Sequence, residues 1–359
     1  MIFLFSHLIN LTLIFFYAKS KSNPYIKIII FPVLVFTISF LSSFQFEAGT
    51  DYRTYFDIFM GEKNLGLYFH KREYAFFFLV SFLRNFVFEP QSLFIVISLI
   101  QGFLICNIMR VVSGQGFNLV LLFFLVFFIS NMLHNQMNLL RAYVAVYSFV
   151  NAFLYRSEGH YKKSFLFFVF GCLWHQSIVF FVPLLFFGRW FYSWIFDNKI
   201  KVYIFTLMIF ILGIPLYFAD SFVSIFFPHY YHYFESEYAK KSIAYVNIVT
   251  KLIYLPLHIL FFYLSRKLSS SYFSNMEVCL LGFWVLTANV FILLLYTSLV
   301  SRFLHFFAFF SIIPIYYLFV WNKSNILLSF LLFMYIILPY IAKVVVFSAG
   351  EYSYNSIFN

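Results

Sequence analysis

The chain has 359 residues, of which 63% are hydrophobic, 26% aromatic and only 10% charged. A soluble globular domain carries about 25% charged residues, so this composition excludes a soluble enzyme, a disordered chain and a secreted disulfide scaffold, and it predicts a protein that crosses a bilayer many times. The formal net charge is +11, but the sequence has no long run of Lys and Arg. We therefore expect the positive charge to lie in cytoplasmic loops that face anionic lipid, and not to bind nucleic acid.

Ten apolar segments are long enough to cross the bilayer, since a helix needs about 20 apolar residues to span ~30 Å of hydrocarbon. They are 1–18, 26–44, 91–109, 117–134, 139–155, 202–219, 248–265, 278–297, 303–321 and 326–346. Two more segments are irregular, because 75–88 is short and 164–187 is interrupted by Trp174-His175-Gln176-Ser177. We therefore expect an all-α polytopic membrane protein with about 10–12 transmembrane helices, one or two of them short, broken or re-entrant. The whole chain, 1–359, is expected to form a single multi-pass domain.

Four short basic loops predict the orientation, because Lys and Arg favour the cytoplasmic side. These loops are 19–27, 156–163, 266–277 and 321–325. Placing them inside puts the N-terminus, the turn at 134–141, the C-terminal tail and two long loops, at about 45–74 and 220–250, outside. Of the 13 acidic residues, only Glu158, Asp197 and Glu277 then lie inside, so polar chemistry is expected on the outer side.

If Arg189, Lys199 and Lys201 are also cytoplasmic, the same orientation requires 75–88 and 164–187 to cross the bilayer an even number of times or not at all. Re-entrant or broken helices meet this requirement, and so does a segment 188–201 that lies along an interface. A break within 164–187 would fall at His175. Non-helical backbone at membrane depth is tolerated only where it lines a cavity in the protein.

The first polar cluster, Gly49-Thr50-Asp51-Tyr52-Arg53, directly follows the second span. Thr50 or Asp51 can cap the start of a helix, and Asp51 and Tyr55 then share a face at spacing i, i+4. The cluster is either a plain helix cap at a membrane boundary or part of a functional site.

A second cluster has a spacing that predicts either one polar stripe on a helix or a turn near 134–138. Its members are Asn131, His134, Asn135, Asn138 and Arg141. An arginine just inside a span is costly unless it is paired or faces water, so it suggests function. The alternative is that Arg141 reaches the interface along its aliphatic stem.

Three further polar features lie along the rest of the chain. His175-Gln176-Ser177 interrupts an apolar segment, either as a satisfied core histidine or as a functional break. Arg302 and His305, at spacing i, i+3, begin the span at 303–321. The aromatic loop from Pro228 to Tyr238 holds two His and two Glu without a metal-binding spacing.

Known cofactor and catalytic motifs do not occur in the sequence. The absence of a P-loop, GxGxxG, HExxH, nucleophile elbow or DxD pair disfavours nucleotide-driven transport, zinc proteolysis, serine hydrolysis and a metal-dependent nucleotide-sugar transferase. Cys106, Cys172 and Cys279 lie far apart in apolar stretches and form no CxxC. No disulfide, metal or cofactor is therefore expected.

The order of these clusters resembles the EpsG-like and Wzy-type family of bacterial polysaccharide polymerases. The resemblance rests on Gly49-Thr50-Asp51-Tyr52-x-x-Tyr55, on Asn138-Leu139-Leu140-Arg141-x-x-x-Ala145, on the basic loop Arg156 to Lys163 followed by Trp174-His175-x-Ser177, and on Arg302. Ala142 departs from the pattern, which more often has Gln after the Arg. Beyond residue 190 the likeness is one of hydropathy.

The resemblance implies a specific reaction. Such enzymes polymerise undecaprenyl-pyrophosphate-linked oligosaccharide repeat units into O-antigen or a related surface polysaccharide, at the outer face of the bacterial cytoplasmic (inner) membrane, and commonly work with a chain-length regulator. On this basis the expected catalytic residues are Asp51, His175 and Arg141, and the expected substrate-binding residues are Arg53, Tyr52, Tyr55, Asn138 and Arg302. The arginines would hold the pyrophosphate, the two tyrosines would line the sugar site, and Asp51 or His175 would accept the acceptor's proton.

Three other functions remain open at the level of sequence. A flippase or other transporter for lipid-linked sugars would need charged groups deep within several spans. A membrane O-acyltransferase using His175 would need that residue to be accessible from the cytoplasm. A purely structural membrane partner is the third alternative.

Overall fold

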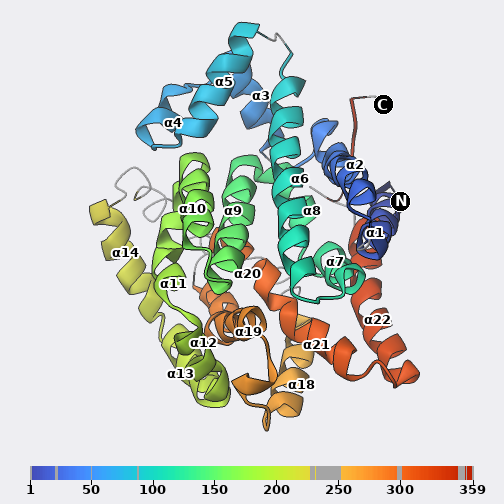
Figure 1. Ribbon diagram of the computed structural model, residues 1–359. Coiled ribbons are helices and arrows are strands. Elements are labelled where there is room, and N and C mark those ends of the chain that lie inside the picture. The colour runs from blue at the N-terminus through green and yellow to red at the C-terminus, as the bar shows by residue number, and fades with distance from the viewer. Residues whose placement is uncertain are drawn as a thin grey trace. The chain divides into compact units, whose positions relative to one another are not determined.

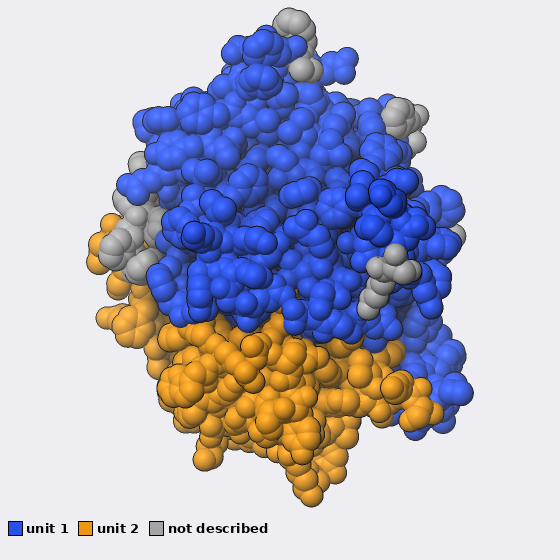
Figure 2. All heavy atoms as spheres, in the orientation of Figure 1, with its two compact units in different colours: residues 1–186, 325–359 blue, residues 187–324 orange. Residues whose placement is uncertain are grey.

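The computed structural model describes residues 2–20, 23–49, 51–86, 89–226, 231, 252–296, 301–346, 352 and 354–357, without the side chains at 219, 220, 222, 226, 301 and 302. Within these residues the regular elements are helices (Figure 1), apart from an isolated bridge between Gln45 and Ser356. Contacts group the chain into two compact units, coloured separately in Figure 2: unit 1 is Met1–Phe186 with Asn325–Asn359, and unit 2 is Phe187–Ser324.

The all-α polytopic architecture predicted from the sequence is confirmed. Six helical stretches in the described part of the chain are long and apolar enough to cross a membrane, and up to nine spans result if each bent helix pair counts as one. The six are Ile2–Lys19, Pro24–Ser43, Gln91–Gly114, Asn275–Leu295, Phe303–Trp321 and Ile326–Val346. The chain is therefore a multi-pass membrane protein.

Unit 1 consists of helices from the N-terminal half of the chain and the last long helix. These are α1 (Ile2–Lys19), α2 (Pro24–Ser43), α3 (Tyr52–Met60), α4 (Gly66–His70), α5 (Tyr74–Phe86), α6 (Gln91–Gly114), α7 (Leu119–Phe128), α8 (Met132–Asn138), α9 (Leu140–Ser157), α10 (Tyr161–Trp174), η2 (Gln176–Phe181), α11 (Val182–Phe186) and α22 (Ile326–Ile341). The helix α9 packs against both α6 and α10, as Figure 1 shows. Every residue of α9 from Tyr143 to Tyr155 is buried, including the polar Ser148 and Asn151.

Polar contacts tie α6 to α9 within this core. The side-chain amide of Asn107 donates to Oδ1 of Asn151 at 2.6 Å, and the amide of Asn151 donates to the backbone carbonyl of Leu104 at 3.0 Å. Buried amides need such partners because lipid and apolar side chains offer none. The two helices are therefore fixed in register as well as packed.

Two helix breaks in unit 1 shape one of its ends. The predicted break at His175 is confirmed, since α10 ends at Trp174 and His175 is extended, with φ −158°. The prediction that 117–134 forms one continuous span is wrong. The helix α7 ends at Phe128, and α8 is bent from it by 49°. Ser130 bonds back to the Val126 carbonyl at 2.5 Å, and Asn131 has the left-handed φ of 54° that ends regular helix there.

Unit 2 is organised around α19. Its elements are α12 (Arg189–Asp197), α13 (Lys199–Ile211), α14 (Ile214–Phe226), α18 (Leu255–Ser265), η3 (Ser270–Tyr272), α19 (Asn275–Thr287), η4 (Val290–Leu295), α20 (Ser301–Ser311) and α21 (Ile313–Trp321). A capping box joins Ser274 and Glu277 at the start of α19. Apart from Tyr231, the aromatic loop from Pro228 to Tyr238 lies outside the described residues.

Gly102 provides a test of the packing between α2 and α6. A Cβ at this position would collide with Oγ of Ser39 and lie 2.7 Å from the backbone oxygen of Val35, whereas a Cβ at Gly114 would meet nothing within 4 Å. We expect Gly102→Ala to destabilise the protein by about 1–3 kcal/mol through overpacking. Gly114→Ala should have no cost. Thermal unfolding of the detergent-solubilised protein measures both variants, and equal midpoints would contradict the close approach of the two helices.

Candidate functional site

A buried ion pair lies at one end of unit 1, where α3, α4 and α5 gather (Figure 1). Nη1 of Arg141, in the first turn of α9, donates to Oε2 of Glu73, which directly precedes α5. The Glu73 side chain is 0% exposed and that of Arg141 is 16% exposed. An isolated buried charge is strongly disfavoured, so each group requires the other. We call this region the α3–α5 end.

The turn after α4 places Glu73 in this buried position. Arg72 adopts a left-handed φ of 57°, which reverses the chain. The backbone N–H of Glu73 then donates to the Tyr68 carbonyl at 2.9 Å, and the Glu73 carbonyl accepts from Phe77 of α5 at 3.1 Å. The backbone of Glu73 is thus fixed on both sides, and its carboxylate is directed at α9.

Aromatic rings surround the guanidinium of Arg141. Its central carbon lies 4.4 Å from the ring centre of Tyr68, 5.1 Å from that of Phe76 and 5.9 Å from that of Tyr55. Each such contact contributes about 0.5–2 kcal/mol, depending on desolvation. Burial raises the pKa of the Tyr55 phenol, although the nearby Arg141 charge opposes the shift. Tyr55 is therefore a neutral hydroxyl at neutral pH and can donate a hydrogen bond.

His175 meets the same carboxylate from the end of α10. Its Nε2 lies 3.9 Å from Oε1 of Glu73. Its Nδ1 accepts the backbone N–H of Ser177 at 3.2 Å and lies 2.7 Å from Oγ of Ser177. Because Nδ1 accepts a hydrogen bond from a backbone N–H, the neutral imidazole carries its ring proton on Nε2. Glu73 thus has one oxygen on Arg141 and the other facing the N–H of His175.

The Gly-Thr-Asp segment is attached to the residues just before α9. The backbone N–H of Asp51 donates to Oδ1 of Asn138 at 2.9 Å. Gly49 has a φ of 78°, and a Cβ there would lie 2.9 Å from the same oxygen. The side chain of Asp51 makes no capping bond to α3, so it does not act as the predicted helix cap; Thr50 lies outside the described residues. Asn138 therefore holds the first polar cluster next to Arg141.

The second polar cluster does not form one stripe. Because α8 ends at Asn138 and Leu139 breaks the helix, its members face different partners. Asn138 contacts Asp51, and Arg141 contacts Glu73. His134 has a different partner, since its Nε2 lies 2.8 Å from the hydroxyl of Tyr340. The same hydroxyl lies 2.7 Å from Nε2 of His7. His134 thus links α8 to α1 and α22.

The structure gives the remaining predicted binding residues other contacts or does not describe them. Tyr52 stacks on Phe94 of α6, with ring centres 4.6 Å apart. Arg53 is 66% exposed and pairs with Asp57 at 3.0 Å. Arg302 belongs to the first turn of α20 in unit 2, and its side chain lies outside the described residues. The structure thus brings Asp51, Tyr55, Asn138, Arg141 and His175 together in unit 1.

Sequence reasoning missed three residues of this site: Glu73, Tyr68 and Phe76. Glu73 had been assigned to the outer side only as one acid among many. The available signal was its position directly before the short apolar segment 75–88, where an acidic residue favours a helix start. No group of three or more His, Cys, Asp or Glu side chains in the described part of the chain could hold a metal ion.

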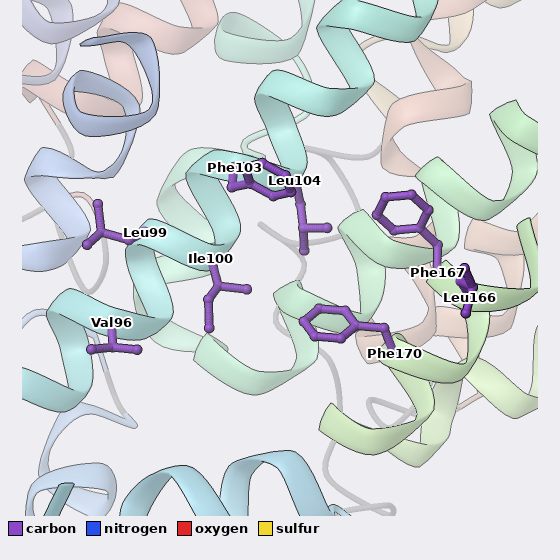
Figure 3. A pocket seen from close by; sticks show the side chains of 8 residues that line it. All are labelled: Val96, Leu99, Ile100, Phe103, Leu104, Leu166, Phe167 and Phe170. Atoms are coloured by element: carbon purple, nitrogen blue, oxygen red, sulfur yellow. The ribbon is translucent and has the colours of Figure 1, made fainter. Parts of the chain in front are cut away.

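An apolar groove of about 700 Å³ runs between α6 and α10 (Figure 3). Its lining is Val96, Leu99, Ile100, Phe103, Leu104, Leu166, Phe167 and Phe170. Phe103 is 49% exposed and Leu166 65%, as suits a surface in contact with lipid tails. Phe170 lies five residues before His175, which is an axial rise of about 8 Å along α10.

The fold and this polar end define a multi-pass membrane protein with a buried arginine–carboxylate site. A family model described as the EpsG family matches residues 28–356, a range that includes every site residue named above. The chain belongs to the EpsG family, the family of Wzy-type polysaccharide polymerase-like proteins. No curated protein and no solved structure matches the chain.

Gly49 and Gly61 form a matched pair that tests the contact with Asn138. Both have positive φ, 78° and 90°, but a Cβ at Gly61 would meet nothing within 4 Å. An alanine at either position therefore costs about the same backbone strain, about 1 kcal/mol. We expect Gly49→Ala to lower the unfolding midpoint further than Gly61→Ala, because it displaces Asn138. Equal effects in thermal unfolding would show that the two clusters are not attached through this contact.

Proposed function

We propose that this chain polymerises lipid-linked oligosaccharide repeat units into a bacterial surface polysaccharide, O-antigen or a related polymer, by glycosyl transfer at the outer face of the cytoplasmic membrane. The donor is undecaprenyl-pyrophosphate-linked oligosaccharide. The observation that carries the proposal is the Arg141 guanidinium, held among aromatic rings beside Glu73 and His175 in a member of the EpsG family. Family membership supports a polysaccharide polymerase role.

Arg141 suits the recognition of a pyrophosphate leaving group. As the bond to the anomeric carbon breaks, negative charge grows on the phosphate oxygens. A guanidinium presents several N–H donors in a planar fork that matches phosphate, and the guanidinium of Arg141 is held 4.4 Å over the Tyr68 ring. A fixed donor aimed at developing charge contributes on the order of 3 kcal/mol to transition-state stabilisation.

Tyr55 and Asp51 suit the sugar side of the site. The neutral hydroxyl of Tyr55 can donate to sugar oxygens, and a carboxylate can accept from sugar hydroxyls. Asp51 stands near enough to Tyr55 to act on its ionisation, and Asn138 holds the Asp51 backbone in place.

The charge distribution supports the proposed orientation. Arg141 and Arg156 stand at opposite ends of α9, an 18-residue helix about 27 Å long. The basic loop that follows Arg156 favours the cytoplasm. A site at the Arg141 end then faces outward, where polymerisation from a lipid carrier would take place.

The groove between α6 and α10 supports a lipid-linked substrate. An isoprenoid chain needs a continuous hydrocarbon surface near the site that holds its pyrophosphate. The groove is lined by hydrocarbon side chains alone (Figure 3), and one of them, Phe170, lies five residues before His175 on α10. We propose that the first isoprene units lie there while the pyrophosphate contacts Arg141.

Deleting the gene and separating the cell-surface polysaccharide on a gel tests the proposed function. Loss of a polymerase leaves single repeat units on the carrier core. A complete absence of repeat units would indicate a flippase instead, and an unchanged ladder would indicate an acyltransferase or a structural partner.

Arg141→Lys tests the role of the arginine in cells that lack the native gene. A lysine keeps the positive charge but loses the bidentate fork and the planar stacking. We expect polymerisation to fall about 10²-fold, by analogy with the removal of one oxyanion-hole donor. Arg72→Lys is the control, because Arg72 is an exposed neighbour of Glu73. A normal polymer ladder from Arg141→Lys, at normal protein level, would remove Arg141 from the mechanism.

A further inference from the structure

The groups around His175 define the direction of its hydrogen bond with Ser177. Nδ1 of His175 accepts the backbone N–H of Ser177 at 3.2 Å, so this nitrogen carries a lone pair and no proton. The contact of 2.7 Å between Nδ1 and Oγ of Ser177 must then be donated by the serine hydroxyl. The serine oxygen keeps both lone pairs for another donor.

The other side of the imidazole faces the buried carboxylate. Nε2 carries the ring proton and lies 3.9 Å from Oε1 of Glu73. Glu73 is wholly buried, whereas the side chain of His175 is 14% exposed and Ser177 is half-buried. Glu73 is therefore the wholly buried member of the three, and His175 stands between it and Ser177.

We propose that Ser177, His175 and Glu73 form the proton relay of the glycosyl transfer, with Ser177 as the group that contacts the acceptor sugar. This inference rests on the proposed function. It also identifies the general base, for which the sequence offered both Asp51 and His175. His175 accepts the proton through Ser177, not directly from the sugar. Glu73 acts through His175 and Arg141 and is a positioning residue.

The step balances without a further reactant. The acceptor oxygen forms a bond to the anomeric carbon, and the bond from that carbon to the pyrophosphate oxygen breaks, with its electron pair leaving on the pyrophosphate. The acceptor proton moves to Oγ of Ser177 while the serine proton moves to Nδ1 of His175. The resulting imidazolium is stabilised by the Glu73 carboxylate, and Arg141 binds the leaving pyrophosphate.

Sharing of one carboxylate couples the two halves of the reaction. Glu73 contacts Arg141 through Oε2 and faces His175 through Oε1. The cation that receives the leaving group and the base that activates the acceptor are therefore held at a fixed separation. Precise mutual placement of this kind accounts for a large share of catalysis in transfer reactions.

The test uses the full-length protein in lipid nanodiscs and lipid-linked repeat units extracted from cells that lack the gene. We expect Ser177→Ala to lower kcat about 10²-fold, the lower range for acid–base catalysis, while KM for the lipid-linked unit changes less than about threefold. Ser177→Thr restores a hydroxyl and should recover most of kcat. Ser81→Ala is the matched control, because Ser81 is also half-buried and bonds only the Phe77 carbonyl, at 2.9 Å.

Glu73→Gln tests the buried end of the relay. A glutamine oxygen can still accept from Arg141, so donor binding and KM should be retained, but the imidazolium loses its counter-charge and kcat should fall at least tenfold. The control is Glu62→Gln, because Glu62 is exposed, in the turn that follows α3. A rise in KM with unchanged kcat would assign Glu73 to donor binding alone and overturn the relay.

Two further outcomes overturn the proposal. If Ser177→Ala keeps kcat within twofold of the native protein, Ser177 is not on the proton path. If Ser177→Ala does not accumulate, Ser177→Gly replaces it, since it also removes the hydroxyl; native kcat in that variant also removes the relay. Failure of the native protein to form polymer in this assay would instead overturn the proposed function, so the two failures are distinguishable.

Discussion

The buried carboxylate of Glu73 is the constraint on which the α3–α5 end of unit 1 depends. An ionised group with no exposed surface is stable only with a charged or hydrogen-bonding partner at each oxygen. Meeting that requirement brings together the turn after α4, the first turn of α9 and the end of α10. The arginine that results is stacked on Tyr68 and only partly exposed, so it is rigid before any ligand arrives. A preorganised cation of this kind is what a developing pyrophosphate charge requires.

Helix breaks supply the polar backbone and side chains around that pair. The break between α8 and α9 places Asn138 where its side chain accepts from the backbone N–H of Asp51. The break after α10 turns His175 so that its two nitrogens face Ser177 and Glu73. Regular helix would have pointed these side chains in directions set by the helix repeat. Because unpaired backbone is tolerated at membrane depth only where protein or water satisfies it, breaks gathered at one end are the structural mark of a site. The buried helix α9 is the rigid support from which this site is built.

Sequence patterns predicted the membrane class, the positions of most helices and the break at His175, because each depends on runs of apolar residues and their interruptions. They also indicated Asp51, Tyr55, Asn138, Arg141 and His175, which the structure brings into one cluster. They missed Glu73, because its pairing with Arg141 joins a loop turn to a distant helix and leaves no local periodicity. They left open whether the residues from Asn131 to Arg141 form one stripe or cross a turn near 134–138, and the structure shows a left-handed residue at Asn131 and a helix break at Leu139 instead of one stripe. Arg53 was chosen for its charge and position in a motif, yet its contact is a surface pair with Asp57.

The central claim is that Glu73 and Arg141 stabilise each other as a buried pair, and a double-mutant cycle on unfolding free energy tests it most directly. The variants are Glu73→Gln, Arg141→Gln and the two combined, unfolded in the same detergent. We predict that Arg141→Gln lowers the free energy of unfolding by about 3–5 kcal/mol, because it leaves the wholly buried carboxylate without its cation. Glu73→Gln should lower it less. The double variant should then recover much of that loss, giving a coupling free energy above about 1 kcal/mol. Additive effects, within about 0.5 kcal/mol, would contradict the account.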